Sequence, residues 1–168
     1  MSEEKKSKRN FDHLETFNVA VGVVFDYFLS QFPVRNSCVD IYPWIEKKLK
    51  PIIEQCDKDG GENEFKRVAG KNYIKGSNIP PETYVEETVS WLKVEGFLHE
   101  FGSGKDPEYQ LSSKTLAVLN AMPGDLTEKL GAKLSDAVKD AGTAAGRSMI
   151  SETVGQIIGA AARSFTGG

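Results

Sequence analysis

Four side chains of this 168-residue chain are of the types that most often carry catalysis: His13, His99, Cys38 and Cys56. An imidazole can transfer protons and a thiolate can attack an electrophile, but each needs a positioned partner, often a carboxylate. None of the four lies in a recognisable catalytic motif. The segment GSGKDP (102–107) lacks the spacing of a phosphate-binding loop. We therefore expect a protein that is not an enzyme and that binds no cofactor.

Acidic residues between positions 57 and 64 match part of a calcium-binding loop. Asp57 and Asp59 would take its first and third positions. The match then fails, because Glu62 stands where the sharp turn needs glycine and Val68 stands where a bidentate glutamate is needed. The two cysteines also lack metal-ligand spacing. We therefore expect no metal site.

A short basic stretch offers the chemistry of phosphate contact. Lysine and arginine neutralise phosphates, and interleaved aromatic residues such as Phe65 and Tyr73 are common in nucleic-acid contacts. The formal net charge of the whole chain is only -3, so a solvent-exposed loop is the alternative interpretation. The candidate nucleic-acid contacts are Lys66, Arg67, Lys71 and Lys75.

The strongest predicted element is a helix over residues 11–32. Its apolar residues recur at spacings of three and four, which is typical of a helix with a wide buried face. Asn10 or Asp12 could cap its start, and Pro33 is expected to end it. We therefore expect this helix to lie largely in the core. Its apolar pattern consists of Phe11, Leu14, Phe17, Val21, Val24, Phe28 and Phe32.

The charged segment 1–10 has no apolar region of the kind found in a secretory signal, so it is predicted to be a disordered tail. A conventional transmembrane helix needs roughly 18 uninterrupted apolar residues, and the sequence has no such run. Two cysteines without a disulfide pattern are typical of reduced thiols. We therefore expect a cytoplasmic protein.

The segment 38–56 is predicted to contain a short extended piece, Cys38 to Tyr42, followed by a helix from about Pro43 to Cys56. Pro51 fits poorly in the interior of that helix, so a kink or two short helices are expected there. A charged loop insertion near 57–79 then separates this helix from the next one.

Residues 80–122 carry the clearest order of elements. Pro80 and Pro81 suit the first turn of a helix, and Gly96 is expected to end it in a left-handed cap. Residues 97–101 and 108–112 alternate apolar and polar side chains around a turn, which predicts a β-hairpin. Ser112 or Ser113 is then expected to cap a final helix that Pro123 ends.

This run resembles the winged-helix superfamily, in the order of helix, wing hairpin and exit helix found in MarR-like domains. The resemblance is carried by WLKVEGFL (91–98), by the hairpin and by YQLSSKTLAVL (109–119). It covers Thr83 to Met122, with residues 11–32 as the first helix, and implies a winged-helix-like domain over 11–123. No clear partner helix directly precedes Pro80, although the helix 44–56 could substitute for it.

The charge of this motif argues against the DNA binding that the resemblance would imply. Between Glu82 and Glu108 there are seven acidic residues against Lys93 and Lys105. No arginine occurs from Ala69 to Gly146, so the commonest contact to guanine is missing from the motif. DNA affinity depends on the neutralisation of phosphates, and an acidic surface cannot provide it. The motif is therefore predicted to contact protein.

The last 45 residues, 124–168, hold half of the chain's 16 glycines and form a predicted helical tail. Its apolar stripe changes face near Arg147 to Met149, so either the helix breaks there or one helix serves two partners. The patterns GTAAG (142–146) and GQIIG (155–159) let helices approach closely. Packing on the same domain, packing on a sister subunit, association with a membrane surface and disorder all remain open. The candidate interface comprises Leu126, Leu130, Leu134, Ala141, Gly142, Gly146, Ile150, Val154, Ile157 and Ile158.

Together these features predict a mainly α protein with a small antiparallel β-hairpin, a winged-helix-like α+β domain, and Gly/Ala-rich C-terminal helices. The expected function is protein–protein contact, with the C-terminal helices mediating self-association into a homo-oligomer or docking on a partner or membrane surface. Two alternatives remain. One is a DNA-binding regulator that uses Lys66 to Lys75, and the other is a membrane-active effector or immunity-type partner protein.

Overall fold

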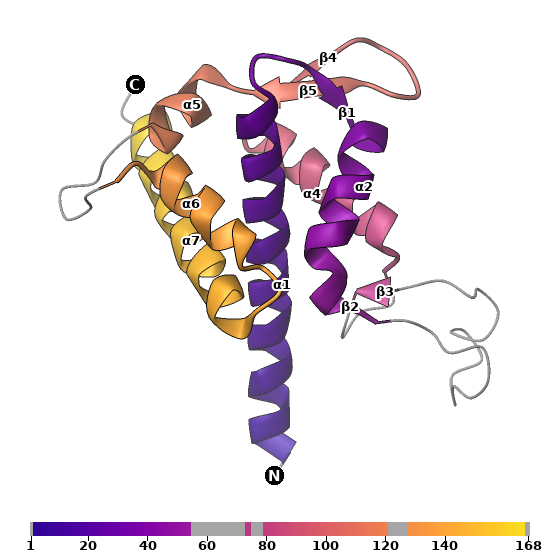
Figure 1. The fold of residues 1–168 in the computed structure, drawn as a ribbon, viewed down its shortest axis with the longest axis vertical. Coiled ribbons are helices and arrows are strands. Elements are labelled where there is room, and N and C mark those ends of the chain that lie inside the picture. The colour runs from indigo at the N-terminus through magenta and orange to yellow at the C-terminus, as the bar shows by residue number, and fades with distance from the viewer. Residues whose placement is uncertain (1, 55–72, 75–78, 121–127, 167–168) are drawn as a thin grey trace.

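The computed structural model describes the backbone of residues 2–54, 73–74, 79–120 and 128–166, and the side chains of 14–53, 74, 79–120 and 128–164. The chain is mainly α-helical with a small antiparallel sheet, which confirms the predicted fold class. Figure 1 shows α1 (Ser2–Gln31) through the middle of the molecule. On one side lie α2 (Cys38–Leu49) and α4 (Pro81–Val94), and on the other lie α5 (Ser113–Leu119), α6 (Leu130–Lys139) and α7 (Ala144–Thr166).

Helix α1 is the centre of the core. Every residue from Val19 to Phe25 is buried, so this part of the helix is covered on all sides. The predicted burial is therefore confirmed for the middle of the helix. It is wrong at the ends of the pattern, where Leu14 and Phe32 are 59% and 42% exposed. The backbone is helical from Ser2, so residues 2–10 of the predicted tail are part of α1 in this structure.

Helix α2 begins earlier than its sequence pattern predicts. Ser37 and Asp40 form a capping box, in which Asp40 N donates to Ser37 Oγ and Ser37 N donates to the Asp40 carboxylate. Residues 38–42 are therefore helical, and only β1 (Asn36–Ser37) is extended. The predicted break at Pro51 is confirmed, since α2 ends at Leu49 and a 3₁₀ turn over Lys50–Ile52 follows.

The charged insertion leaves and re-enters the fold through a short antiparallel ladder. Strand β2 (Ile53–Glu54) pairs with β3 (Tyr73–Ile74), with Ile53 opposite Ile74. Ile74 is fully buried, so this ladder is part of the core beside α4. The insertion between the two strands lies outside the described residues.

The predicted hairpin is confirmed as β4 (Leu98–Phe101) and β5 (Glu108–Leu111), and it forms the wing referred to below. Gly96 ends α4 with a φ of 81°, where Gly96 N donates to Lys93 O and Phe97 N donates to Leu92 O. Strand β1 pairs with β5 on the other side, so the order in the sheet is β1-β5-β4. Ser112 caps α5 through its hydroxyl, as predicted.

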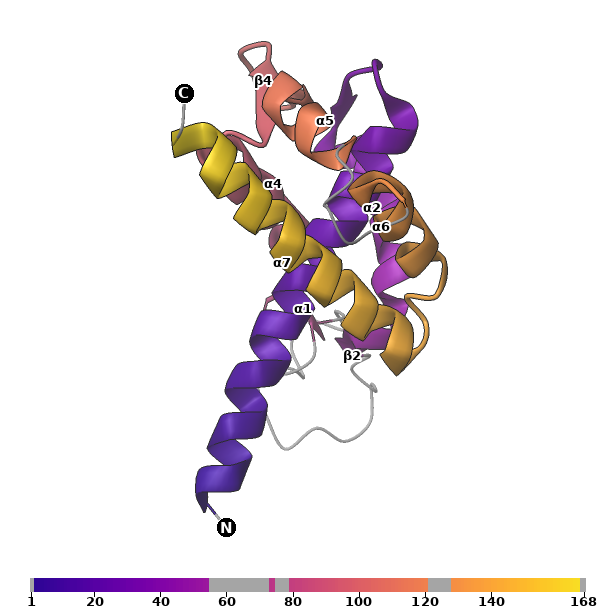
Figure 2. The same cartoon turned by 90° about the vertical axis from the view of Figure 1, so that its left-hand side faces the viewer.

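Helices α6 and α7 form an antiparallel hairpin. The turn over residues 140–143 separates them, so the C-terminal segment contains two helices. Figure 2 shows α7 crossing α1 obliquely with α6 beside it. The apolar stripe changes face along the sequence because the chain reverses, and both stripes then turn towards α1. The break lies a few residues before the predicted position at Arg147.

Candidate functional site

The C-terminal candidate interface residues lie mostly inside the chain's own core. The face made by α6 and α7 covers α1 and α5, so these side chains are not open to a partner in this fold. Of the remaining candidates, Gly146 is buried, Ile158 is partly buried and Gly142 is exposed. Leu126 lies outside the described residues, as do Lys66, Arg67, Lys71 and Lys75. The fully or almost fully buried candidates are Leu130, Leu134, Ala141, Ile150, Val154 and Ile157.

The packing of α6 and α7 on α1 uses a glycine that the predicted interface does not include. A Cβ atom built on Gly22 of α1 would lie 2.4 Å from Cγ2 of Ile150 and 3.2 Å from Cδ1 of Leu134. Only glycine lets α6 and α7 approach α1 this closely. The sequence signal is a single glycine within an otherwise apolar helical run. By contrast, a Cβ on Gly155 would meet nothing within 4 Å, so that glycine does not mediate packing among the described residues.

Polar contacts fix how the C-terminal hairpin sits on α1. The Ser135 hydroxyl donates to the Asp26 carboxylate, and the Asn18 side-chain amide donates to Ser151 Oγ over 3.1 Å. These contacts join residues more than 100 positions apart in the sequence. They give α6 and α7 one alignment on α1, because a shift along the helix would break both.

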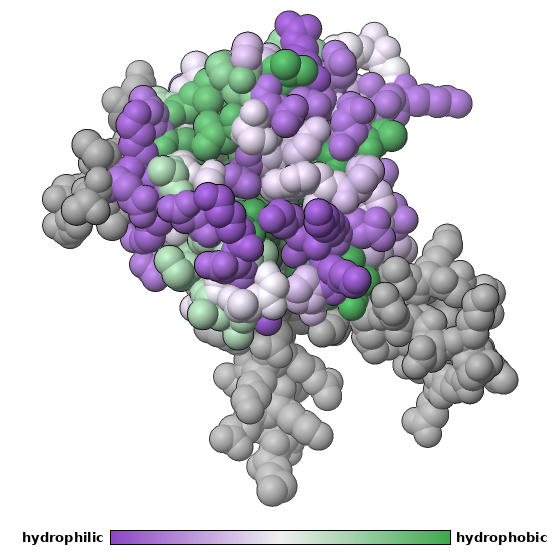
Figure 3. All heavy atoms as spheres, viewed as in Figure 1, coloured by the Kyte–Doolittle hydropathy of each residue, from purple (hydrophilic) through white to green (hydrophobic). Residues whose placement is uncertain are grey.

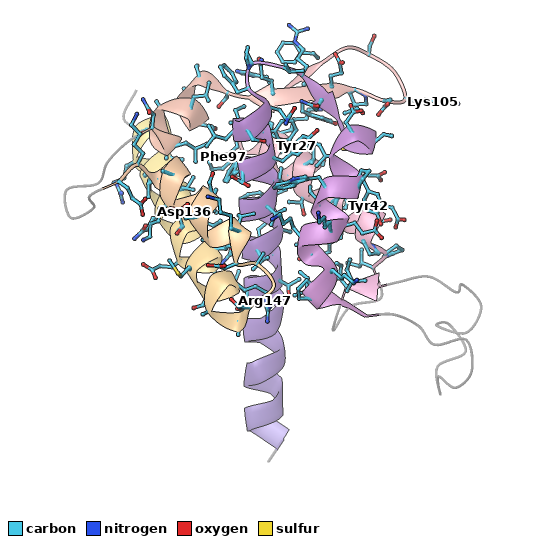
Figure 4. All side chains as sticks on the ribbon, viewed as in Figure 1. Tyr27, Tyr42, Phe97, Lys105, Asp136 and Arg147 are labelled. Atoms are coloured by element: carbon cyan, nitrogen blue, oxygen red, sulfur yellow. The ribbon has the colours of Figure 1, made fainter. Side chains whose placement is uncertain are left out.

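A groove of about 720 Å³ opens between α2, α4 and the wing. Three segments that are distant in sequence meet there: 38–43 from α2, 82–86 from α4, and 105–109 from the wing and β5. Figure 4 shows Tyr42 on the side of α2 that faces away from α1, and Lys105 at the end of the wing. The charged residues that line it are Glu82, Glu86, Asp106 and Lys105. Much of the remaining lining consists of Cys38, Val39, Tyr42, Val85, Pro107 and Tyr109.

The electrostatics of the groove disfavour further negative charge. Burial raises the pKa of the Cys38 thiol to about 11, and the carboxylates of Glu86 and Asp106 add to the shift. Burial also raises the pKa of Tyr42 to about 12, and the nearby carboxylates of Glu82 and Glu46 add to the shift. Both groups therefore stay neutral at physiological pH, and the carboxylates set the charge of the groove.

The same sign of charge extends over the outer face of α4. Glu82, Glu86, Glu87 and Glu95 are all exposed. Lys93 is paired with Glu100 on the wing, with 2.8 Å between Nζ and Oε2, so its charge is locally balanced. Figure 3 shows a mainly hydrophilic surface that apolar residues interrupt beneath the wing. Val39, which is 69% exposed at the start of α2, lines the groove there.

Of the four residues whose types most often carry catalysis, the structure describes the side chains of His99 and Cys38, whereas Cys56 and the His13 side chain lie outside the described residues. His99 is exposed on β4 with its ring 6.5 Å from that of Phe101, and the Cys38 thiol is protonated. In the part of the chain that the structure describes, no group of three or more His, Cys, Asp or Glu side chains could hold a metal ion. Among the same residues, none of the helices is sufficiently long and apolar to cross a membrane.

Comparison of the chain with protein-family models, with curated proteins and with solved structures gives no match.

Proposed function

We propose that the chain is a non-enzymatic, cytoplasmic protein of winged-helix type that acts by protein–protein contact through α2, α4 and the wing. The element order supports the winged-helix part of this proposal. Helix α1 is followed by β1, α2, the short β2–β3 ladder, α4 and the hairpin. Strand β1 pairs with β5 to give the order β1-β5-β4. Helix α2 packs against α4, so it takes the place of the partner helix that the sequence left uncertain.

The charge of the outer face is the observation that carries the protein-contact part. In a winged helix that reads DNA, the helix before the wing and the wing itself approach phosphates. Here the corresponding surface exposes Glu82, Glu86 and Glu87 on α4 and Asp106 on the wing. These carboxylates would repel a phosphate backbone, so the surface is suited to a protein partner that carries positive charge.

The C-terminal helices contribute in a different way from the one that their small-residue patterns suggest. Their apolar stripes hold α1 and α5, and α1 in turn contacts α2, α4 and β5. Self-association or membrane docking through these helices remains a prediction. It would have to use the outward face of α7, where Met149 is 46% exposed and Gly155 is open.

Site-specific photocrosslinking in living cells tests the proposal. Benzoylphenylalanine replaces Glu87 on α4 in one variant and Glu152 on the outward face of α7 in the other, since both positions are exposed. We expect a discrete adduct from the Glu87 position that protease removes and nuclease does not. The adduct should disappear when Glu82 and Glu86 are both changed to lysine. An adduct that forms only from the Glu152 position would assign partner contact to α7 instead.

DNA regulation through the basic stretch is the second candidate, because the element order is also that of DNA-binding domains. A mobility-shift assay at two salt concentrations separates the two functions. Weak binding with little salt dependence is expected from the acidic face. Tight, strongly salt-dependent binding that weakens when Lys66, Arg67 and Lys71 become alanine would establish the regulator and refute the protein-contact proposal.

A further inference from the structure

The groove between α2, α4 and the wing has the size and the walls of a binding site. Its volume of about 720 Å³ lies within the range of roughly 300–1,000 Å³ that is typical of ligand pockets. Val85 and Tyr109 are buried, 2% and 8% exposed, and form part of its lining, whereas Val39 is exposed at its edge. Val39 therefore presents apolar surface in the groove that the described residues leave uncovered.

Carboxylates stand around this apolar surface. Glu82 and Glu86 lie one helical turn apart on α4, and Asp106 faces the groove from the wing. Lys105 is the only cation among the lining residues, and it lies at the end of the wing. Because acidic groups outnumber the cation three to one, the complementary occupant is positively charged.

An arginine or lysine side chain combines the two properties that the groove requires. Its aliphatic stem covers apolar surface while its charged head reaches polar groups. The stem can lie against Val39, Tyr42 and Pro107, which are lining residues of the groove. The head can then donate charge-assisted hydrogen bonds to the carboxylates of Glu82, Glu86 or Asp106. The same carboxylates would repel an anionic ligand.

We propose that this groove takes an arginine or lysine side chain from a basic segment of a partner protein. The proposal rests on the protein-contact function above and adds the site and the chemistry of the partner. It assigns the binding energy to Glu82 and Glu86, which line the groove. It does not assign it to Glu87 on the same helix or to Glu95 at the C-cap of that helix, which are exposed but lie outside the lining.

Fluorescence anisotropy with a labelled hexa-arginine peptide and the full chain tests the assignment. Changing both Glu82 and Glu86 to glutamine removes two lining charges without changing side-chain size. We expect the dissociation constant to rise about five- to tenfold, which two exposed ion pairs can supply. The matched control changes Glu87 and Glu95 to glutamine, which alters the net charge equally. The control should change the constant by less than about twofold, because screening weakens charges outside the groove.

Amide NMR spectra of the full chain locate the peptide independently. We expect the largest shift changes at Cys38, Tyr42, Val85 and Asp106, which line the groove. The groove assignment would be overturned if the two glutamine variants lost peptide affinity equally, or if the chemical-shift changes were confined to the outer face of α4. Either result would leave the protein-contact proposal standing. Absence of peptide binding would also overturn the groove assignment, and the crosslinking result alone would then decide the wider proposal. Tighter binding of duplex DNA than of the peptide would overturn both.

Discussion

The guanidinium carbon of Arg35 lies 3.7 Å from the centre of the Phe101 ring. This cation–π contact joins the segment after α1 to the last residue of β4. Nearby, the side-chain amide of Gln110 on β5 donates to the carbonyl of Pro33. The wing is therefore attached to the end of α1 as well as to α4, which positions the wall of the groove that it provides.

Replacing Arg35 with alanine should loosen the wing. The cation–π contact contributes about 0.5–1 kcal/mol at an exposed site, and we expect the free energy of unfolding in urea to fall by that amount. Hydrogen exchange of residues 102–107 should also accelerate. Arg35→Lys is the matched control, because it keeps the charge and is expected to lose only part of the contact. Unchanged exchange in the alanine variant would show that α4 alone holds the wing.

Alanine at Gly22 and at Gly155 should act in opposite directions. At Gly22 the new methyl group meets Ile150 and Leu134, and overpacking of this kind costs about 1–3 kcal/mol. At Gly155 the methyl group meets nothing within 4 Å, so the gain in helix propensity of about 0.5–1 kcal/mol should appear. Urea denaturation of both variants measures the difference. Similar changes in the free energy of unfolding for both variants would contradict the close approach of α7 to α1.

Removal of residues 124–168 should abolish cooperative folding. The deletion uncovers α1 residues that pack on α6 and α7, and it removes buried side chains including Leu134, Ile150 and Ile157. We expect the 1–123 fragment to aggregate or to lose its cooperative thermal transition, as measured by circular dichroism and light scattering. A monomeric fragment with a cooperative transition would show that the C-terminal helices form a dispensable unit.

The Cys38 thiol should react slowly with iodoacetamide in the folded protein. Its pKa is raised from 9.0 to about 11, so at pH 8 the thiolate fraction is lower by about 100-fold than for an ordinary thiol. We expect a corresponding slowing relative to the urea-unfolded chain. The measurement uses a Cys56→Ser background and mass spectrometry. Equal rates in the folded and unfolded chains would contradict the burial of this thiol.

The raised pKa of the Cys38 thiol also predicts that the folded protein loses stability at alkaline pH. Because the folded pKa of Cys38 is raised, the neutral thiol contributes stability that is complete below about pH 9 and is lost as the pH approaches 11. Tyr42, Tyr84 and Tyr109, with pKa values raised to about 12, should extend the loss to higher pH. Urea titrations at several pH values measure the free energy of unfolding. Between pH 9 and 11 this free energy should fall less in the Cys38→Ala variant than in the unchanged protein.

Local sequence signals predicted the elements whose cause is local. The periodicity of residues 11–32 predicted the core helix, and Gly96 predicted the end of α4. The serine pair 112–113 predicted the cap of α5, which Ser112 provides. The extended structure predicted for residues 38–42 was wrong, although a local signal was present. Ser37 and Asp40 have the spacing of a capping box, which outweighs the β-branched residues that follow.

The sequence by itself determined that the chain is mainly helical with one hairpin, because helix periodicity, strand alternation and capping depend on residues a few positions apart. Tertiary structure decided which apolar faces meet. It showed that the stripes of α6 and α7 cover α1 where Gly22 admits them, because a chain reversal turns both faces inward. It also assembled the groove from segments 38–43, 82–86 and 105–109, a juxtaposition that only packing creates.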